Sequence, residues 1–254
     1  MKIVTIRKLV LLLVIYFFTV VSVHASVVLK NTRVIFPGDS VEHTIQFTNN
    51  DDFPNIVQLW TDKGDSQSTP ETADGPFSLL PPIFKVDKES GQSVRMIYTG
   101  DGLPNNKESV FYLNFLVIPP NSEGLEGQNQ LKIVLRNRVK IFYRPSSIDG
   151  NPRDSIDNMS TEVMYGTDGE PESIKVKNNS GYYISMSSLN VEKGTTRYSY
   201  EPVMVEPYSS TTLENFVRTE KITNQKESAN GAVLNIVYVN DYGAHVPKSI
   251  AINK

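Results

Sequence analysis

The feature that most limits the fold of this chain is a series of short segments with β-sheet character after residue 26. These segments are rich in β-branched and aromatic residues, several of them alternate, and clusters of Asn, Asp, Gly and Pro separate them. They are Val41–Asn49, Asn55–Trp60, Ser93–Thr99, Ser109–Val117, Leu131–Tyr143 and Ala232–Val239. Outside the first 25 residues, no window of a dozen residues keeps the apolar spacing of an amphipathic helix. The pattern predicts an all-β chain built as β-sandwiches.

The length of the chain predicts two such sandwiches. The chain has 254 residues, whereas a single small sandwich of the immunoglobulin type needs about 100. The segment Pro145–Arg153 follows a strong strand pattern and gathers Pro, Ser, Gly and Asn, so it marks the boundary between domains. We therefore expect an N-terminal domain over residues 26–147 and a C-terminal domain over residues 148–254.

The first 25 residues have the layout of a secretory signal peptide. Lys2, Arg7 and Lys8 precede the uncharged apolar run Leu9–Val23, and Val23-His24-Ala25 offers small residues at the cleavage positions. The alternative is a retained membrane anchor, but 15 apolar residues fall short of the roughly 20 that span a bilayer. We expect cleavage near residue 25, export, and no stable membrane insertion.

The charge balance and the lack of cysteine exclude several classes of protein. The formal net charge is −3, from 25 basic and 28 acidic residues. Because the first 25 residues hold three basic and no acidic residues, the remainder would carry a net charge of −6. A nucleic-acid partner is not expected, since binding phosphates needs clustered Lys and Arg. The absence of cysteine excludes thiolate metal sites, cysteine nucleophiles and disulfides.

The remaining chemistry of the chain gives no sign of an enzyme. Only His43 and His245 follow the first 25 residues, and there is no G-x-S-x-G elbow, metal-binding pattern or Gly-rich phosphate loop. We expect no catalytic residues, metal or cofactor. Trp60 and the tyrosines near Tyr182-Tyr183 and Tyr198–Tyr200 suggest either core and rim aromatics or a sugar-binding surface, and the first is the more ordinary interpretation.

One predicted strand is unusually long. Gln130–Arg144 runs fifteen residues without Gly or Pro, whereas most strands have at most about ten. Leu131, Ile133 and Leu135 share one face of it, and Lys140 has the opposite parity. These three apolar residues are either ordinary inward core positions or an exposed row on an edge that accepts a strand from a partner.

With these segments in view, the chain resembles the periplasmic pilus chaperones, the two-domain immunoglobulin-like family of P-pilus and type 1 pilus assembly. Lacking cysteine, and with about ten residues from Asn121 to Gln130, it resembles the short-loop branch of that family. The segments that carry the resemblance are Asn31–Pro37, Asn49–Trp60, Pro76–Lys85, Gln92–Tyr98, Leu103–Asn114, Ile118–Pro120, Arg138–Pro145 and Asn240–Gly243.

The resemblance implies a fold and a function. The fold is two immunoglobulin-like sandwiches arranged as a boomerang with a cleft between them. The function is that of a periplasmic chaperone, which folds and caps pilus subunits by donor strand complementation and delivers them to an outer-membrane usher. In that process the extended strand lends Leu131, Ile133 and Leu135 to a subunit that lacks its own final strand.

The resemblance also implies roles for five further residues. Arg33 and Lys140 match the pair that binds the C-terminal carboxylate of the subunit, a role suited to one planar and one compact cation. Taken alone, each would be interpreted as a solvated strand charge. Glu108, Arg144 and Asp241 match an ion network at the junction of the two domains, which would fix the cleft angle.

The competing hypothesis is a secreted immunoglobulin-like pilus subunit or adhesin. Such a protein would more often contain a disulfide and would end in its own alternating strand, whereas Ser249–Lys254 is a polar ending. If the chain is a chaperone with an exposed apolar edge, we also expect weak self-capping between two copies.

Overall fold

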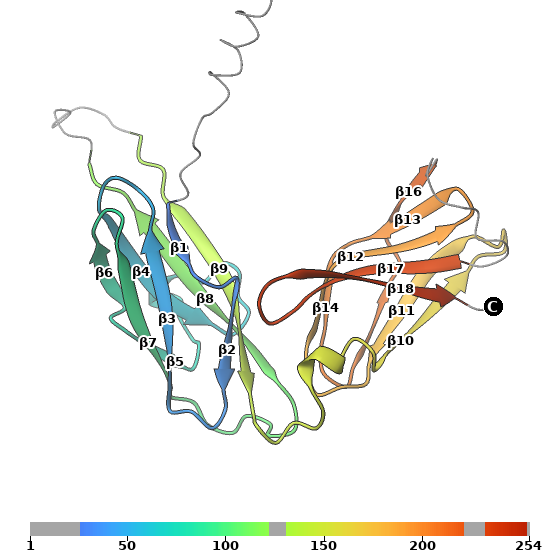
Figure 1. Ribbon diagram of the computed structural model, residues 1–254, viewed down its shortest axis with the longest axis horizontal. Helices are drawn as coiled ribbons and strands as arrows, with labels where there is room; N and C mark the ends of the chain where they lie inside the picture. The colour runs from blue at the N-terminus through green and yellow to red at the C-terminus, as the bar shows by residue number, and fades with distance from the viewer. Residues whose placement is uncertain (1–25, 122–130, 221–231, 253–254) are drawn as a thin grey trace, which may run out of the picture.

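The computed structural model describes residues 26–121, 131–220 and 232–252 (Figure 1). The described elements are strands, apart from two short 3-10 helices, Pro70–Thr72 (η1) and Pro152–Asp154 (η2). Across these ranges there is no helix with the length and apolar character needed to span a membrane. The predicted signal peptide, residues 1–25, lies outside the described residues.

The first sandwich packs two sheets against each other. Their strand orders are β1-β3-β7-β5 and β2-β9-β8-β4-β6. Phe36, Phe47, Met96 and Leu113 are completely enclosed between them. The strands are β1 (Val27–Leu29), β2 (Arg33–Pro37), β3 (Glu42–Asn49), β4 (Asn55–Asp62), β5 (Phe77–Leu80), β6 (Ile83–Val86), β7 (Gly91–Tyr98), β8 (Ser109–Ile118) and β9 (Leu135–Arg144).

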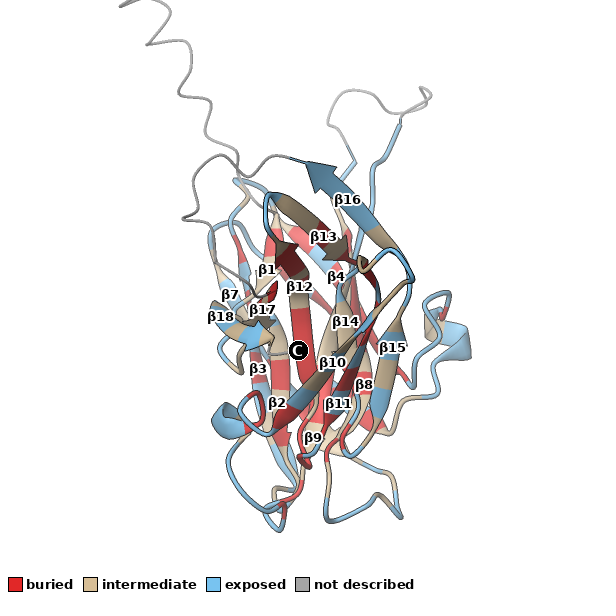
Figure 2. Cartoon of the chain, turned by 90° about the vertical axis from the view of Figure 1, so that its right-hand side faces the viewer, coloured by how far each residue is buried: buried red, intermediate tan, exposed pale blue. Residues whose placement is uncertain are grey.

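The second sandwich has a separate core. One sheet has the order β10-β11-β15, and the other has the order β16-β13-β12-β17-β18 with β14 paired to β12. Ile174, Leu189 and Leu234 are fully buried in this core, and Figure 2 colours much of β12 as buried. The strands are β10 (Met159–Tyr165), β11 (Pro171–Asn178), β12 (Ile184–Lys193), β13 (Thr196–Tyr200), β14 (Val203–Val205), β15 (Ser210–Leu213), β16 (Phe216–Glu220), β17 (Ala232–Val239) and β18 (His245–Ile252).

The predicted all-β architecture with two sandwiches is confirmed, but the expectation of a polar chain ending without its own strand is wrong. β18, His245–Ile252, pairs with β17 along its whole length. The strand is hard to detect in the sequence because β18 lies at the edge of the sheet, where alternate residues such as Ser249 face solvent.

The predicted fifteen-residue strand Gln130–Arg144 is also shorter than expected. Gln130 lies outside the described residues, and β9 begins only at Leu135, which pairs with Val117 of β8. The partner strand β8 ends at Ile118 and Pro119-Pro120 follow, so no backbone N–H groups are available to extend the ladder. Residues 131–134 therefore continue as exposed chain rather than as a paired strand.

Part of β9 has a free edge, because β2 pairs with only the second half of this strand. β1 pairs antiparallel with β3 in one sheet, and β2 then pairs parallel with β9 in the other sheet. The β2 pairing starts at Arg33 opposite Lys140, so over residues 135–139 the described strands provide β9 with β8 as its single neighbour. A free strand edge presents unpaired N–H and C=O groups.

The two sandwiches meet at one end and lie at an angle to each other (Figure 1). The Glu108 N–H donates to the Gly181 carbonyl at 2.8 Å across the junction. The hairpin between β17 and β18 reaches back to the first sandwich, where Gly243 has a φ of +79°. A Cβ atom on Gly243 would lie 2.0 Å from Thr32 Oγ1, so this close approach requires glycine.

Candidate functional site

Three apolar side chains project from the sandwich where β9 begins. Leu131, Ile133 and Leu135 are 91%, 69% and 53% exposed. Further along the same face, Val139 packs against the core and Ile141 is fully buried. The row continues the core face of β9 beyond the end of the sandwich, so the interpretation of these residues as inward core positions is wrong.

Arg33 and Lys140 lie side by side on the outer face of the sheet. They are directly opposite each other in the parallel pairing of β2 with β9, and paired residues of neighbouring strands share a face. The Arg33 Nη1 atom donates to the Val239 carbonyl at 3.0 Å. The Arg33 Nε atom is buried without a hydrogen-bond partner, and Lys140 makes no ion pair with any described residue.

The electrostatic environment of these two cations is unfavourable for positive charge. Burial lowers the pKa of Lys140, and the nearby cations Arg33 and Arg138 lower it further. Burial also lowers the pKa of Arg33, although Asp241 and Glu108 oppose the effect. Two half-buried cations without a carboxylate bonded to them form a site where an added anion would be stabilised.

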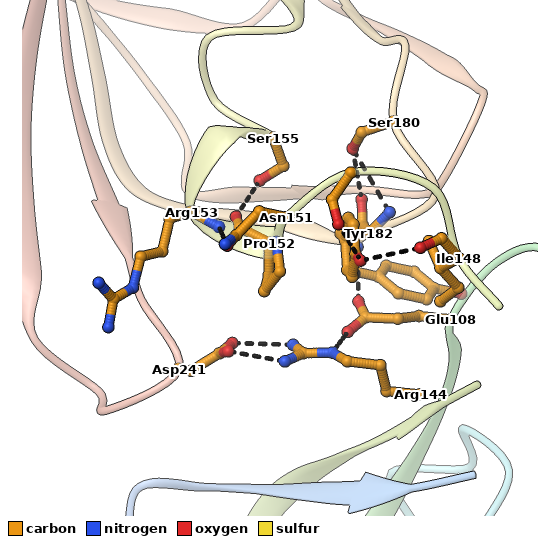
Figure 3. Close-up of polar contacts among 12 residues, drawn as sticks. Glu108, Arg144, Ile148, Asn151, Pro152, Arg153, Ser155, Ser180, Tyr182 and Asp241 are labelled. Atoms are coloured by element: carbon orange, nitrogen blue, oxygen red, sulfur yellow. Dashed lines mark hydrogen bonds and ion pairs between the residues drawn. The ribbon is translucent and has the colours of Figure 1, made fainter. Parts of the chain in front are cut away.

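Arg144 lies between Glu108 and Asp241 at the junction of the domains (Figure 3). The Arg144 Nε atom donates to Glu108 Oε1 at 2.6 Å, and its Nη1 and Nη2 atoms donate to the Asp241 carboxylate at 2.7 and 2.9 Å. Glu108 and Arg144 belong to the first sandwich, whereas Asp241 follows β17 of the second. The structure therefore brings together the three residues predicted to form an ion network.

The network is largely removed from water. Glu108 is only 3% exposed, and its Oε2 atom accepts the Tyr183 N–H at 2.7 Å. Burial raises the pKa of the Glu108 carboxyl, although the Arg144 charge and the Tyr183 N–H oppose this. Burial alone would lower the pKa of Arg144, but its bonds to Asp241 and the Glu108 charge outweigh burial and raise it.

A cavity of about 500 Å³ lies in the cleft between the sandwiches. Arg33 and Arg144 line it from the first sandwich, and tyrosines line it from the second. Tyr182 is buried, as the interpretation as a core or rim aromatic expects, and it also closes the junction. Its hydroxyl donates to the Gly150 carbonyl at 3.1 Å, and the Arg144 guanidinium lies 5.4 Å from its ring centre. The sequence around Tyr182 contains no pattern that predicts its contacts with Gly150 and Arg144.

Comparison with known proteins places both sandwiches in one family. The model of the pili and flagellar-assembly chaperone, PapD N-terminal domain, matches residues 26–149. The model of the pili assembly chaperone PapD, C-terminal domain, matches residues 158–250. This chain belongs to the PapD family of pilus assembly chaperones.

Individual members of the family are similar over nearly their whole length. The probable fimbrial chaperone YehC of Escherichia coli is 33% identical over 94% of this chain and 92% of its own. The chaperone protein MrkB of Klebsiella pneumoniae is 34% identical over 90% and 93%. The crystal structure of the Pseudomonas aeruginosa CupB2 chaperone has a TM-score of 0.70 at 26% identity, and it covers 89% of this chain and 100% of CupB2.

Membership of this family disfavours the hypothesis of a pilus subunit or adhesin, although β18 removes the argument that was based on the polar ending. The family is one of chaperones rather than enzymes. Among the described residues no group of three or more His, Asp or Glu side chains is arranged to hold a metal ion.

Proposed function

We propose that this protein acts in the periplasm, where it captures pilus subunits, completes their fold by donor strand complementation, and delivers them to an outer-membrane usher. The observation that carries the proposal is the free edge of β9 over residues 135–139, which continues into the exposed row Leu131, Ile133 and Leu135. An apolar row on an unpaired edge is suited to β-strand addition. In this role the row fills the groove that the missing strand of the subunit leaves open.

The apolar row supplies most of the affinity. Burying three side chains of this size stabilises a complex by about 1.5–3 kcal/mol each, or roughly 5–9 kcal/mol in total. The free protein keeps these side chains exposed, so their burial on binding brings a net gain rather than an exchange of one core for another.

Arg33 and Lys140 are the proposed anchor for the C-terminal carboxylate of the subunit. Their neighbouring positions, the unpartnered Arg33 Nε atom and the absence of an ion pair to Lys140 among the described residues support this role. A carboxylate fixed at this point would set the register of the added strand. Register matters because a slip of one residue turns every apolar side chain of a strand to the wrong face.

The proposal is tested by co-expression with candidate pilus subunits from the same organism, followed by pull-down and mass spectrometry. We expect subunits to be recovered with this protein as soluble one-to-one complexes. Recovery of no subunit, or subunits that polymerise equally with and without this protein, would reject the function.

Asp241→Asn is expected to loosen the orientation of the two domains, because the change removes the charge that Arg144 contacts through two hydrogen bonds. The proposed role of the network is to hold the cleft angle. Small-angle scattering should show a broader distribution of shapes, and limited proteolysis should become faster near residues 145–153. Glu162→Gln, a change on β10 at a carboxylate with no described ion pair, is the control. Scattering and proteolysis that match this control would contradict the role.

Two copies of the free protein are expected to cap each other weakly through the exposed edge, because an unprotected apolar edge favours pairing. Sedimentation velocity should show an average mass that rises with protein concentration and returns to the monomer value when a subunit is bound. A mass that stays constant across the concentration range would exclude self-capping.

A further inference from the structure

Arg136 is an exposed cation that is held in a fixed position on the outer face of β9. Its Nε and Nη2 atoms donate to the Asn114 Oδ1 atom at 3.2 and 2.7 Å. Its guanidinium carbon lies 5.1 Å from the centre of the Trp60 ring, within the range of a cation–π contact. Asn114 and Trp60 are both buried, so they form a rigid support. The other N–H groups of the guanidinium remain free for a ligand.

The orientation of the Asn114 amide is itself fixed by a buried carboxylate. The Asn114 Nδ2 atom donates to Asp62 Oδ2 at 2.6 Å, which directs Oδ1 toward Arg136. The Asp62 side chain is completely buried, and it also accepts the Gly64 N–H at 2.8 Å. Asp62 and Asn114 are therefore positioning residues for Arg136.

The neighbouring Arg138 differs from Arg136 in its charge balance. Arg138 donates to both oxygens of Asp62, at 2.6 and 3.2 Å, so its charge is neutralised. Arg136 bonds to a neutral amide, and no carboxylate of the described residues forms an ion pair with it. Arg136 thus carries an uncompensated charge in a preorganised position, which is the arrangement that favours an incoming carboxylate.

The free edge of β9 determines which group of a bound subunit would lie beside Arg136. When a strand is added to this edge, the residue opposite Arg136 points to the same face, one strand spacing of about 4.8 Å away. The added strand cannot continue past Lys140, because β2 occupies that side of β9 from there onward. The residue beside Arg136 is therefore about four residues before the C-terminal residue of the subunit.

We infer that Arg136 binds a Glu or Asp side chain of the subunit strand, about four residues before its C-terminus. This inference rests on the proposed function, since it requires strand addition to β9 with the subunit carboxylate near Arg33 and Lys140. It adds a selective contact to that function: chain ends with an acidic residue at this position bind better than neutral ones.

The test uses three short synthetic peptides with alternating apolar residues, designed to add to the edge of β9. In the first peptide the residue four positions before the C-terminal residue is Glu, in the second that residue is Gln, and the third has the same Glu and an amidated C-terminus. Their affinities are measured by fluorescence anisotropy for the wild-type protein and for Arg136→Gln and Arg136→Lys. Lys177→Gln, which removes one exposed cation from β11 in the second sandwich, is the matched control.

We expect the wild-type protein and Lys177→Gln to prefer the Glu peptide over the Gln peptide by about two- to fivefold, as an opposite-charge pair across strands would give. Arg136→Gln should abolish the preference, with a small fall in melting temperature because the buried Asn114 Oδ1 atom loses its charged donor. Arg136→Lys should retain part of the preference. Equal affinities of the wild-type protein for these two peptides would overturn the inference. If amidation of the terminus does not weaken binding, the proposed anchor fails instead, and if none of the peptides binds, both are rejected.

Discussion

Replacing Lys140 by Ala is expected to reduce the capture of pilus subunits by at least about 30-fold, because removing one partner of a buried charge pair typically costs 2–5 kcal/mol. The melting temperature should stay the same or rise. Burial and the neighbouring cations lower the pKa of Lys140, so its positive charge is unfavourable in the free folded protein. The measurements are the yield of subunit in a pull-down and differential scanning calorimetry of the purified variant.

Subunit capture and melting temperature, measured together, distinguish a residue that anchors the subunit from one that supports the fold. Lys177→Ala, at an exposed lysine in the second sandwich, removes the same charge and should change neither capture nor melting temperature. Normal recovery of subunit by Lys140→Ala would reject the anchor. A large fall in its melting temperature would show that Lys140 supports the fold instead. Arg33→Ala should also abolish capture, but Arg33 bonds to the Val239 carbonyl and its loss also affects the junction.

The second large effect is expected for Ile133→Asp. Each apolar side chain of the row contributes about 1.5–3 kcal/mol when it is buried in the subunit, so its loss alone corresponds to more than about tenfold in affinity. The carboxylate would also enter an apolar groove without a partner, which adds a further cost. The stability of the free protein should be unchanged, since Ile133 is 69% exposed. Capture is measured by pull-down and stability by chemical denaturation.

Val217→Asp is the matched control for this change. Val217, on the edge strand β16 of the second sandwich, is 68% exposed, so the substitution places a carboxylate in an equally exposed position. Subunit capture should be unaffected by Val217→Asp. If Ile133→Asp instead destabilises the free protein and leaves capture intact, the row belongs to the core of this protein and the proposed function is wrong.

The fold class could be predicted because β-strand periodicity is a local property. Alternation and turn residues predict β-sandwiches, the length of the chain predicts two of them, and the predicted strand Ala232–Val239 has the bounds that the structure shows. Edge strands with one solvated face, such as β16 and β18, carry a weaker apolar signal and were not predicted. The start of β9 was also mispredicted, because it depends on where β8 ends and not on the residues of β9 itself.

The residues of the candidate site also differ in how far their roles can be predicted from the sequence. The parity that separates Lys140 from Leu135 can be read from the sequence, because side chains alternate along a strand. The contacts that hold Arg136 in place cannot be predicted from the sequence. They depend on Asn114 and Asp62, which belong to other strands far away in the sequence. Whether a strand charge is free or neutralised depends on contacts that form only when the sheet is assembled, as the difference between Arg136 and Arg138 shows.

In the proposed function, the strand β2 would give the protein a means to discriminate between polypeptide termini and internal segments. Because β2 pairs with β9 from Lys140 onward, a guest strand that continued beyond this point would collide with backbone already in place. The backbone of an internal segment continues past this point, whereas the last strand of a polypeptide can end here. In the proposed function, β2 thus acts as a stop that favours guest strands whose chain end lies near Lys140.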